Sequence, residues 1–162
     1  MLKTGSSIVE EKASNVVPRT FDTYMAVIEN APGSEMFKNA YADVDGVKED
    51  ITDNGDLSCA FFVSSVLVIF GFIREVHITV ASTVKDMENC GWFDTEDPKP
   101  GDVVVWGVEH SGDQKHKHIG FFLGDGRAVS NSKYERRLKD HSLEMAGRDI
   151  ERILTSDRSR AK

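Results

Sequence analysis

A long apolar run that begins just after a polar turn constrains the fold more than any other feature of this chain. Residues 60–73 read AFFVSSVLVIFGFI, and the turn before them ends in Cys59. A helix that is apolar on nearly all sides is buried, so we predict a central helix over residues 58–74. The run is shorter than the about 20 apolar residues that span a membrane, and Ser64 and Ser65 interrupt it.

Cys59 would lie in the first turn of that helix. There, unpaired backbone N–H groups and the helix dipole favour negative charge, so we expect a lowered pKa for the thiol. His118 opens the segment HIGFFLGDG, which predicts a strand that ends in a hairpin turn. A cysteine at a helix start and a histidine on a strand are the arrangement of a thiol hydrolase. The alternatives are a buried packing cysteine and a strand histidine that bonds only to the backbone.

The remaining pattern predicts an α+β architecture, with helices packed on one face of a small antiparallel sheet. Residues 42–56 are rich in Asp and Gly and lack large apolar residues, so we expect a loop there. The expected helices cover residues 21–30, 34–41 and 84–90, and the expected strands cover residues 103–107, 118–123 and 127–132, with a strand or short helix over 149–155.

Composition and charge narrow the classes of function. The 162 residues suit a single domain with a real core. The net charge of −7 divides into −10 over residues 1–131 and +3 over residues 132–162. The acidic body lacks the basic footprint of a nucleic-acid-binding protein, so we expect no nucleic-acid partner. Two cysteines, Cys59 and Cys90, are too few for a disulfide framework, and Cys90 is expected to be a packing residue.

The two ends of the chain are expected to lie outside the domain. Residues 1–17 are polar and aperiodic, which predicts a flexible arm, and residues 156–162 are expected to be a disordered basic tail. The arm has no apolar stretch of signal-peptide kind. We therefore expect a soluble protein with no membrane partner, which is cytoplasmic or exported by a non-classical route.

Three segments resemble the NlpC-type cell-wall peptidase family, which belongs to the papain-like superfamily together with the CHAP amidases. LSCAFFV at residues 57–63 is similar to the family's nucleophile segment, and PGDVVVW at residues 100–106 is similar to its Pro-Gly-Asp strand. The hairpin that begins at His118 resembles its histidine hairpin. The segments occur in family order and at family-like spacing, and the resemblance covers residues 54–132.

The resemblance implies a papain-like cysteine hydrolase domain over residues 18–155, with N-terminal helices and a nucleophile helix on a small antiparallel sheet. It implies a peptidase or amidase of bacterial or phage origin that hydrolyses an amide bond through a thioester acyl-enzyme. The substrate would be a peptidoglycan stem peptide or a related small peptide. Cys59 would be the nucleophile and His118 the base, with no cofactor.

The third catalytic residue of the family lies on the strand after the hairpin turn. That register falls on Ser130 in this chain, and serine is a poor partner for orienting an imidazole. We therefore expect a bulge that presents Asn131 to His118, with Ser130 and His141 as the alternatives.

The surroundings of the nucleophile also depart from the family. Ser58 and Ala60 stand where the family often has Asp and Ser. The backbone N–H of Cys59 would form part of an oxyanion hole. Ser58 and Tyr41 are the expected residues of the oxyanion and substrate-binding region, because the family often has an aromatic hydroxyl near the site.

Other functions stay open on the same residues. His116 and His118, with His110 nearby, suggest a zinc site, but no Cys or carboxylate at ligand spacing completes it, so we expect no metal. The acidic loop before Cys59 is either a solvated loop or a recognition site for a substrate amine. The altered residues around Cys59 also fit a non-catalytic binding or assembly module on this fold, in a phage particle or secretion apparatus. A thiol acyltransferase is a further alternative.

Overall fold

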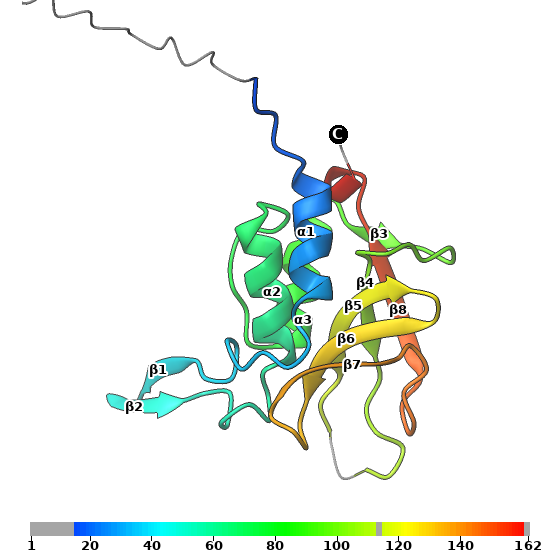
Figure 1. Cartoon of the computed structure of the whole chain (residues 1–162). Coiled ribbons are helices and arrows are strands. Elements are labelled where there is room, and N and C mark those ends of the chain that lie inside the picture. Colours follow the sequence, from blue (N-terminus) through cyan, green and yellow to red (C-terminus); the bar gives the residue numbers. More distant parts are fainter. Residues whose placement is uncertain (1–14, 113–114, 161–162) are drawn as a thin grey trace, which may run out of the picture.

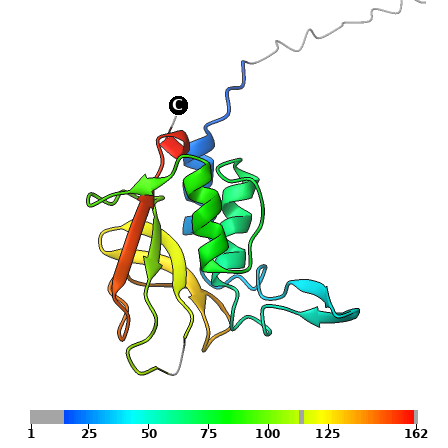
Figure 2. The same ribbon diagram turned by 180° about the vertical axis from the view of Figure 1, so that it is seen from behind.

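The computed structural model describes residues 15–112 and 115–160, and it shows three α-helices on one face of a six-stranded antiparallel sheet (Figures 1 and 2). The sheet has the order β3-β8-β4-β5-β6-β7, so the expected α+β architecture is confirmed. The helices are α1 (Thr20–Glu29), α2 (Cys59–Ile69) and α3 (Val80–Asn89), with a 3-10 turn at Arg158–Arg160. The strands are β1 (Tyr41–Val44), β2 (Val47–Asp50), β3 (Phe93–Asp94), β4 (Val103–Trp106), β5 (His118–Gly124), β6 (Arg127–Ser132), β7 (Arg137–Ser142) and β8 (Ile150–Thr155).

Helix α2 is the centre of the core, as its all-round apolar sequence predicts. Phe62 and Leu67 have no exposed surface, and the Phe62 ring meets the ring of Phe121 on β5 edge-on at 5.3 Å between centroids. The helix is shorter than expected, because Gly71 takes a left-handed conformation with φ of 68°, which ends a helix readily in glycine. None of the helices among the described residues is long and apolar enough to cross a membrane.

Helix α1 is tied to the start of β4 by one buried side chain. Tyr24 is fully buried and donates its hydroxyl to the carbonyl oxygen of Gly101 at 2.7 Å. Its ring also packs edge-on against Phe72 and Phe121. Gly101 has a φ of 92°, and a Cβ there would lie 3.0 Å from the Tyr24 ring. Glycine is therefore required where the chain turns into β4.

The segment predicted as a loop at residues 42–56 contains a β-hairpin, so that prediction is wrong for β1 and β2. Asp45 and Gly46 join the strands with φ of 50° and 83°, and two consecutive positive φ values belong to a type I′ hairpin turn. The Asp-Gly pair is the sequence signal for it. The hairpin projects away from the helices and the large sheet (Figure 1).

The helix predicted over residues 34–41 is also absent. The backbone at the start of this segment pairs with β7 instead. Gly33 N–H donates to the Leu138 carbonyl oxygen at 2.7 Å, and Leu138 N–H donates to the Ser34 carbonyl oxygen at 3.1 Å. This pairing with β7 takes the place of helical hydrogen bonds. Strand β7 was not predicted from the sequence.

Residues 149–160 contain one correct prediction and one wrong prediction. Residues 149–155, predicted as a strand or short helix, form β8, which lies between β3 and β4. Residues 158–160, predicted as part of a disordered tail, form a 3-10 turn, and Arg160 pairs with the buried Asp102 at 2.6 Å. A buried carboxylate requires a partner, which fixes this end of the chain. Of the predicted N-terminal arm, residues 1–14 lie outside the described residues.

Candidate active site

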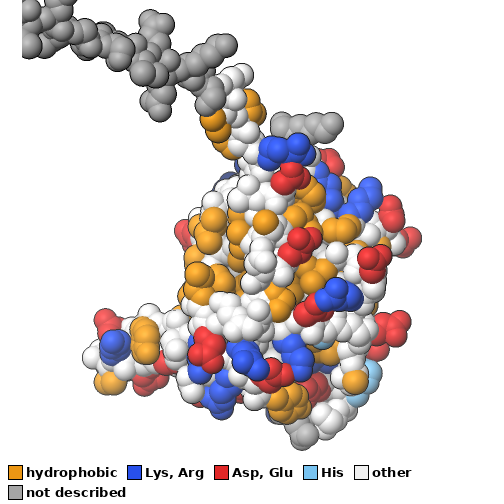
Figure 3. All heavy atoms as spheres, in the orientation of Figure 1, with side chains coloured by type: hydrophobic (Ala, Val, Ile, Leu, Met, Phe, Trp, Pro, Cys, Tyr) orange, Lys and Arg blue, Asp and Glu red, His pale blue; other side chains and the backbone are white. Residues whose placement is uncertain are grey.

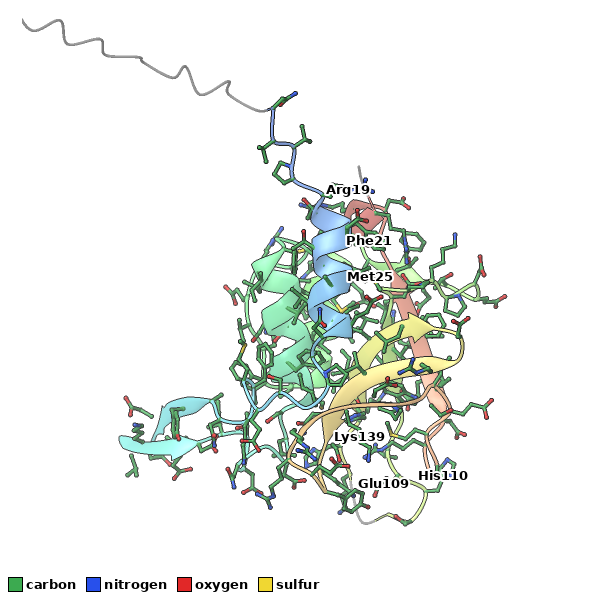
Figure 4. All side chains as sticks on the ribbon, in the orientation of Figure 1. Arg19, Phe21, Met25, Glu109, His110 and Lys139 are labelled. Carbon is green, nitrogen blue, oxygen red and sulfur yellow. The ribbon has the colours of Figure 1, made fainter. Side chains whose placement is uncertain are left out.

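A cleft of about 1030 Å³ lies where the N-terminus of α2 meets the large sheet. Four neighbouring elements supply its polar residues: Cys59 from α2, His118 from β5, Ser130 and Asn131 from β6, and His141 from β7. Glu109 and Lys139 are also on its wall and lie at the same end of the molecule (Figure 4). The fold therefore gathers the cysteine, the histidine and all the candidates for the third residue in one place.

Cys59 is the first residue of α2 and is partly buried. Burial raises the pKa of its thiol above the ordinary value, although the backbone amides of Ile119 and Ala60 and the charge of Arg148 act in the opposite direction. The expected lowering of this pKa is therefore wrong. The helix N-terminus lies against the sheet, and there the loss of hydration outweighs the helix dipole. The resting thiol is protonated at neutral pH.

His118 begins β5 and is neutral at the same pH. Burial lowers its pKa to about 3, and the nearby charges of Arg148, His141 and Lys133 contribute in the same direction. The Trp106 ring on β4 flanks it at 5.6 Å between centroids. The site thus holds a neutral thiol and a neutral imidazole, which can accept a proton.

Two hydrogen bonds connect His118 to a second histidine. His118 Nε2 lies 2.8 Å from Ser130 Oγ, and Ser130 Oγ lies 2.7 Å from His141 Nε2. His141 Nδ1 in turn lies 2.8 Å from the carbonyl oxygen of Ser142. Ser130 is only 1% exposed, so this chain of side chains is shielded from water at its centre.

Asn131 does not reach His118, and the predicted bulge does not form. Ser130 pairs with Gly120 on one side and Lys139 on the other, and Asn131 follows in regular register opposite Leu138. Strands on both sides of β6 hold this register. The Asn131 amide instead donates to the carbonyl oxygen of Gly55 at 2.6 Å, so it anchors the loop that leads to Cys59.

Glycine at position 120 makes the approach to Ser130 possible. A Cβ there would lie 2.5 Å from the carbonyl oxygen of Val129 and 2.7 Å from the Ser130 Cβ. Any larger residue would separate β5 from β6 at the level of the site. The glycine after His-Ile in the sequence is a signal for this close approach.

One carboxylate of the acidic segment before Cys59, that of Asp50, is hydrogen-bonded to neighbouring residues. The carboxylate of Asp50 accepts hydrogen bonds from Thr52, Asn39 and the backbone N–H of Asn54. Despite opposition from desolvation, these bonds hold the pKa of Asp50 well below its usual value. Arg136 on the far side donates to the carbonyl oxygens of Asp53 and Asn54. The loop is thus a fixed support for α2.

Ser58 and Tyr41 lie away from the cleft wall. Ser58 is buried, and its hydroxyl donates to the carbonyl of Lys38 at 3.2 Å. Tyr41 is 62% exposed on the projecting hairpin, where Lys48 Nζ lies 4.6 Å from its ring centroid. The structure does not bring either side chain to Cys59.

Arg148 is a residue of the cleft wall with a buried, charged side chain, and it was not predicted from the sequence. Its side chain is 6% exposed and donates to the carbonyl oxygens of Gly107 and His116 at 2.6 and 2.8 Å. Glu109 pairs with Arg148 and also with Lys133. Arg148 therefore fixes the β4–β5 connection beside the site and adds positive charge there. It lies outside every segment that carries the family resemblance, so no motif signalled it.

The alternative zinc site has no complete ligand set among the described residues, which contain no group of three or more potential metal ligands. His110 is paired instead with Asp149 at 3.0 Å. His118 uses one ring nitrogen for Ser130. Two of the three histidines that suggested a metal are thus engaged with protein side chains.

Comparisons with known proteins extend the description of the fold. No family model matches the sequence, and a search of curated proteins gives no match. The P60 domain of an antigen from M. avium subspecies paratuberculosis has a similar structure, with a TM-score of 0.51 and 17% identity over 84% of this chain and 96% of that domain. The peptidoglycan hydrolase RipB from Mycobacterium tuberculosis gives a TM-score of 0.47 and 15% identity over 86% of this chain and 67% of RipB. At such identities the likeness concerns the fold alone, and the P60 domain supports a papain-like α+β fold.

Proposed function

We propose that this protein is a cysteine hydrolase of the NlpC type that cleaves an amide bond in peptidoglycan stem peptides. One observation carries the proposal: Cys59 at the N-terminus of α2 and His118 at the start of β5 line the same cleft. The sequence resemblance over residues 54–132 and the fold shared with the P60 domain support it. Ser130, bonded to His118 at 2.8 Å, is the proposed orienting residue in place of Asn131.

The protonation states of the site favour general-base activation of the thiol. Because the thiol and the imidazole are both neutral at rest, His118 takes the proton as the Cys59 sulfur attacks the amide carbon. The negative oxygen that develops is stabilised by the Cys59 backbone N–H, which has no partner within its helix. His118 then gives the proton to the leaving amine, and the C–N bond breaks to leave a thioester.

Hydrolysis of the thioester restores the enzyme. His118 removes a proton from water as its oxygen attacks the thioester carbon, and the C–S bond breaks. The sulfur recovers its proton and the carboxylic acid leaves. The cleft wall carries cations and carboxylates together, with Lys133, Lys139 and Arg148 beside Glu109 and Glu144, so it suits a peptide that carries both kinds of charge.

The deciding assay is digestion of purified peptidoglycan, with new amino and carboxyl ends identified by mass spectrometry. The expected result is release of cleaved stem peptides by the native chain and none by Cys59→Ala. Cys90→Ala is the matched control, because its sulfur interacts with Asp86 outside the cleft, and it should cleave normally. Equal cleavage by Cys59→Ala, or no cleavage by the native chain, would contradict the proposal.

Ser58 and Ala60 beside Cys59, and Ser130 as the partner of His118, depart from the family's residues and favour a second candidate, a binding or assembly module that retains the papain-like fold without catalysis. In that case the native chain and Cys59→Ala would bind a stem-peptide fragment with equal affinity, and neither would change its mass. Isothermal titration followed by mass spectrometry of the same sample separates the two functions.

A further inference from the structure

We propose that Ser130 and His141 act in series as one positioning unit, in which the charge of His141 decides which ring nitrogen of His118 carries its proton. The inference rests on the proposed function, because the position of that proton matters only when His118 serves as a base. It concerns Ser130 and His141 as positioning residues, since His141 acts on His118 through the serine.

When His118 and His141 are both neutral, only one assignment of donors and acceptors fits their hydrogen bonds to Ser130 and Ser142. The carbonyl oxygen of Ser142 can only accept, so His141 carries its proton on Nδ1. Its Nε2 is then an acceptor and receives the hydroxyl proton of Ser130 at 2.7 Å. Ser130 Oγ, having donated its only proton, accepts from His118 Nε2–H at 2.8 Å. His118 Nδ1 is therefore free of a proton and can take one from the Cys59 thiol.

Protonation of His141 reverses this chain of hydrogen bonds. Both ring nitrogens of His141 then donate, so Ser130 accepts from Nε2 and its hydroxyl proton turns toward His118. His118 Nε2 becomes the acceptor, and its proton moves to Nδ1, where it blocks the basic nitrogen. The other arrangement, in which Ser130 accepts from both histidines, would leave the hydroxyl proton of a residue that is 1% exposed without an acceptor, which is costly.

The packing around the pair keeps this chain of side chains rigid. The ring of Trp106 lies 5.6 Å from both imidazole centroids, and its Nε1 is fixed by the carbonyl of Leu143. The charged and titratable groups that share the cleft with His141 are Lys139 on its own strand, Lys133 after β6, Glu144 after β7, Glu109, Lys115, His116 and Lys117 from the β4–β5 connection, Arg148 before β8, and Asp56 before α2.

The sign of the pH dependence follows from these surroundings. Burial lowers the pKa of His141, with a smaller contribution from Lys139, while the bond to Ser142 acts in the opposite direction. Burial lowers the pKa of His118 to about 3, and the positive charge of His141 itself contributes to that lowering. As the pH falls, His141 therefore takes up a proton before His118 does. Hydrolysis should decline with the titration of His141, at a pH where His118 itself is uncharged.

Nitrogen-15 NMR of the histidine rings tests the tautomers directly, without a substrate. At pH 8 we expect His118 to carry its proton on Nε2 and His141 on Nδ1, with the signals assigned from Ser130→Ala, His118→Ala and His141→Gln. On acidification, the His118 proton should shift to Nδ1 with the same midpoint as the protonation of His141. A His118 proton on Nδ1 at pH 8, or no shift as His141 titrates, would overturn the inference.

Three variants test the same unit through its effect on activity against purified peptidoglycan. Glutamine can accept from Ser130 but cannot titrate, so His141→Gln should lower the neutral-pH rate less than His141→Phe does and should lose the decline at acid pH. His141→Phe and Ser130→Ala should each lower kcat about 10-fold without raising KM, the size expected for one lost neutral hydrogen bond. The double variant should be no worse than Ser130→Ala, because the residues act in series.

The two kinds of failure are distinguishable. If the chain does not cleave peptidoglycan but the NMR tautomers switch together, the proposed function fails and the coupling holds. If the chain cleaves peptidoglycan while His141→Gln shows the native pH profile, the coupling fails and the proposed function holds. A purely structural role for His141 would lower the rates of His141→Gln and His141→Phe equally and leave the profile unchanged.

Discussion

At the scale of single residues, the proposed mechanism depends on proton transfer between two groups that are neutral at rest. Burial raises the pKa of the Cys59 thiol and lowers that of the His118 imidazole. Such a pair lacks the standing thiolate that makes a cysteine reactive by itself. The nucleophile therefore depends on its base at the moment of attack.

This dependence predicts the result of removing the base. His118→Ala should lower kcat by about 100-fold or more, the range of general-base assistance, and should also slow alkylation of Cys59 by iodoacetamide. His110→Ala is the control, because His110 is exposed and pairs with Asp149. Peptide mapping after timed alkylation gives the rates at Cys59 and Cys90 separately. Unchanged alkylation of Cys59 in His118→Ala would show that the imidazole does not assist the sulfur.

Some residues of the candidate site could be predicted from the sequence and others could not. Cys59 and His118 were predicted because each lies in a local motif at the start of an element. The proposed third residue, Ser130, was expected only as an alternative, because its role depends on register. Ser130 pairs with Gly120 on β5 and Lys139 on β7, which brings its hydroxyl to His118, while Asn131 donates to the Gly55 carbonyl oxygen. The raised thiol pKa was missed for a related reason, because burial of a helix end is set by tertiary packing.

At the scale of elements, the site depends on how closely β5 approaches β6. Gly120→Ala would place a Cβ 2.5 Å from the Val129 carbonyl oxygen, so we expect a loss of about 1–3 kcal/mol in the free energy of unfolding and weaker coupling of His118 to Ser130. Gly126→Asn is the control, because position 126 has open space and asparagine tolerates its positive φ. Urea denaturation measures the free energy of unfolding of both variants. Equal stability of Gly120→Ala and the native chain would rule out the close approach.

A second element-scale prediction concerns the connection between α2 and α3. Asp86 on α3 accepts from His77 Nε2 at 2.9 Å and from the backbone N–H groups of Arg74 and Glu75. Burial opposes these bonds, but they lower the pKa of Asp86 below its ordinary value. The bonds therefore stabilise the fold when the pH is above the ordinary carboxyl pKa, and this stabilisation is lost as the pH falls through the pKa of the folded state. Asp86→Asn should have a lower free energy of unfolding than the native chain at pH 7, and the difference between the two chains should be smaller near pH 3. A pH-independent difference in urea midpoints would contradict this.

Elements were predicted best where the sequence pattern is local and strong. The all-apolar run of α2 and the Gly-Asp-Gly hairpin of β5 and β6 were placed nearly correctly. Strand β7 was missed because its residues, RLKDHS, have no apolar alternation, and its position is set by pairing with β6. The β1–β2 hairpin was missed because its Asp-Gly turn was counted as loop composition, although that pair is a strong hairpin signal.

At the scale of the whole molecule, one face separates apolar from charged side chains. Hydrophobic side chains gather there over the helices, while charged side chains lie along the right edge and the lower part of the domain (Figure 3). The cleft lies at that lower part, with Lys139 and Glu109 (Figure 4). The rim around the partly buried sulfur carries charges of both signs, which is compatible with the polar peptide substrate of the proposed function.

The two ends of the described chain are joined through one buried charge. Asp102 at the start of β4 has no exposed surface, and its carboxylate accepts from Arg160 at 2.6 Å and from the Lys99 backbone N–H at 2.7 Å. The Arg160 guanidinium also lies over the ring of Phe21 on α1, 5.4 Å from its centroid. The C-terminal turn thus holds α1 against the start of the strand that supports His118.

Removal of this pair should weaken the whole fold. Arg160→Ala leaves the Asp102 carboxylate with the backbone bond alone, and we expect a loss of about 1–3 kcal/mol in the free energy of unfolding, the cost of an unsatisfied buried charged group. Arg158→Ala is the matched control, because Arg158 is exposed in the same turn and should be near neutral. Urea midpoints of the three chains at pH 7 give the comparison. If Arg160→Ala had the same urea midpoint as Arg158→Ala, the C-terminal turn would not hold α1 to β4.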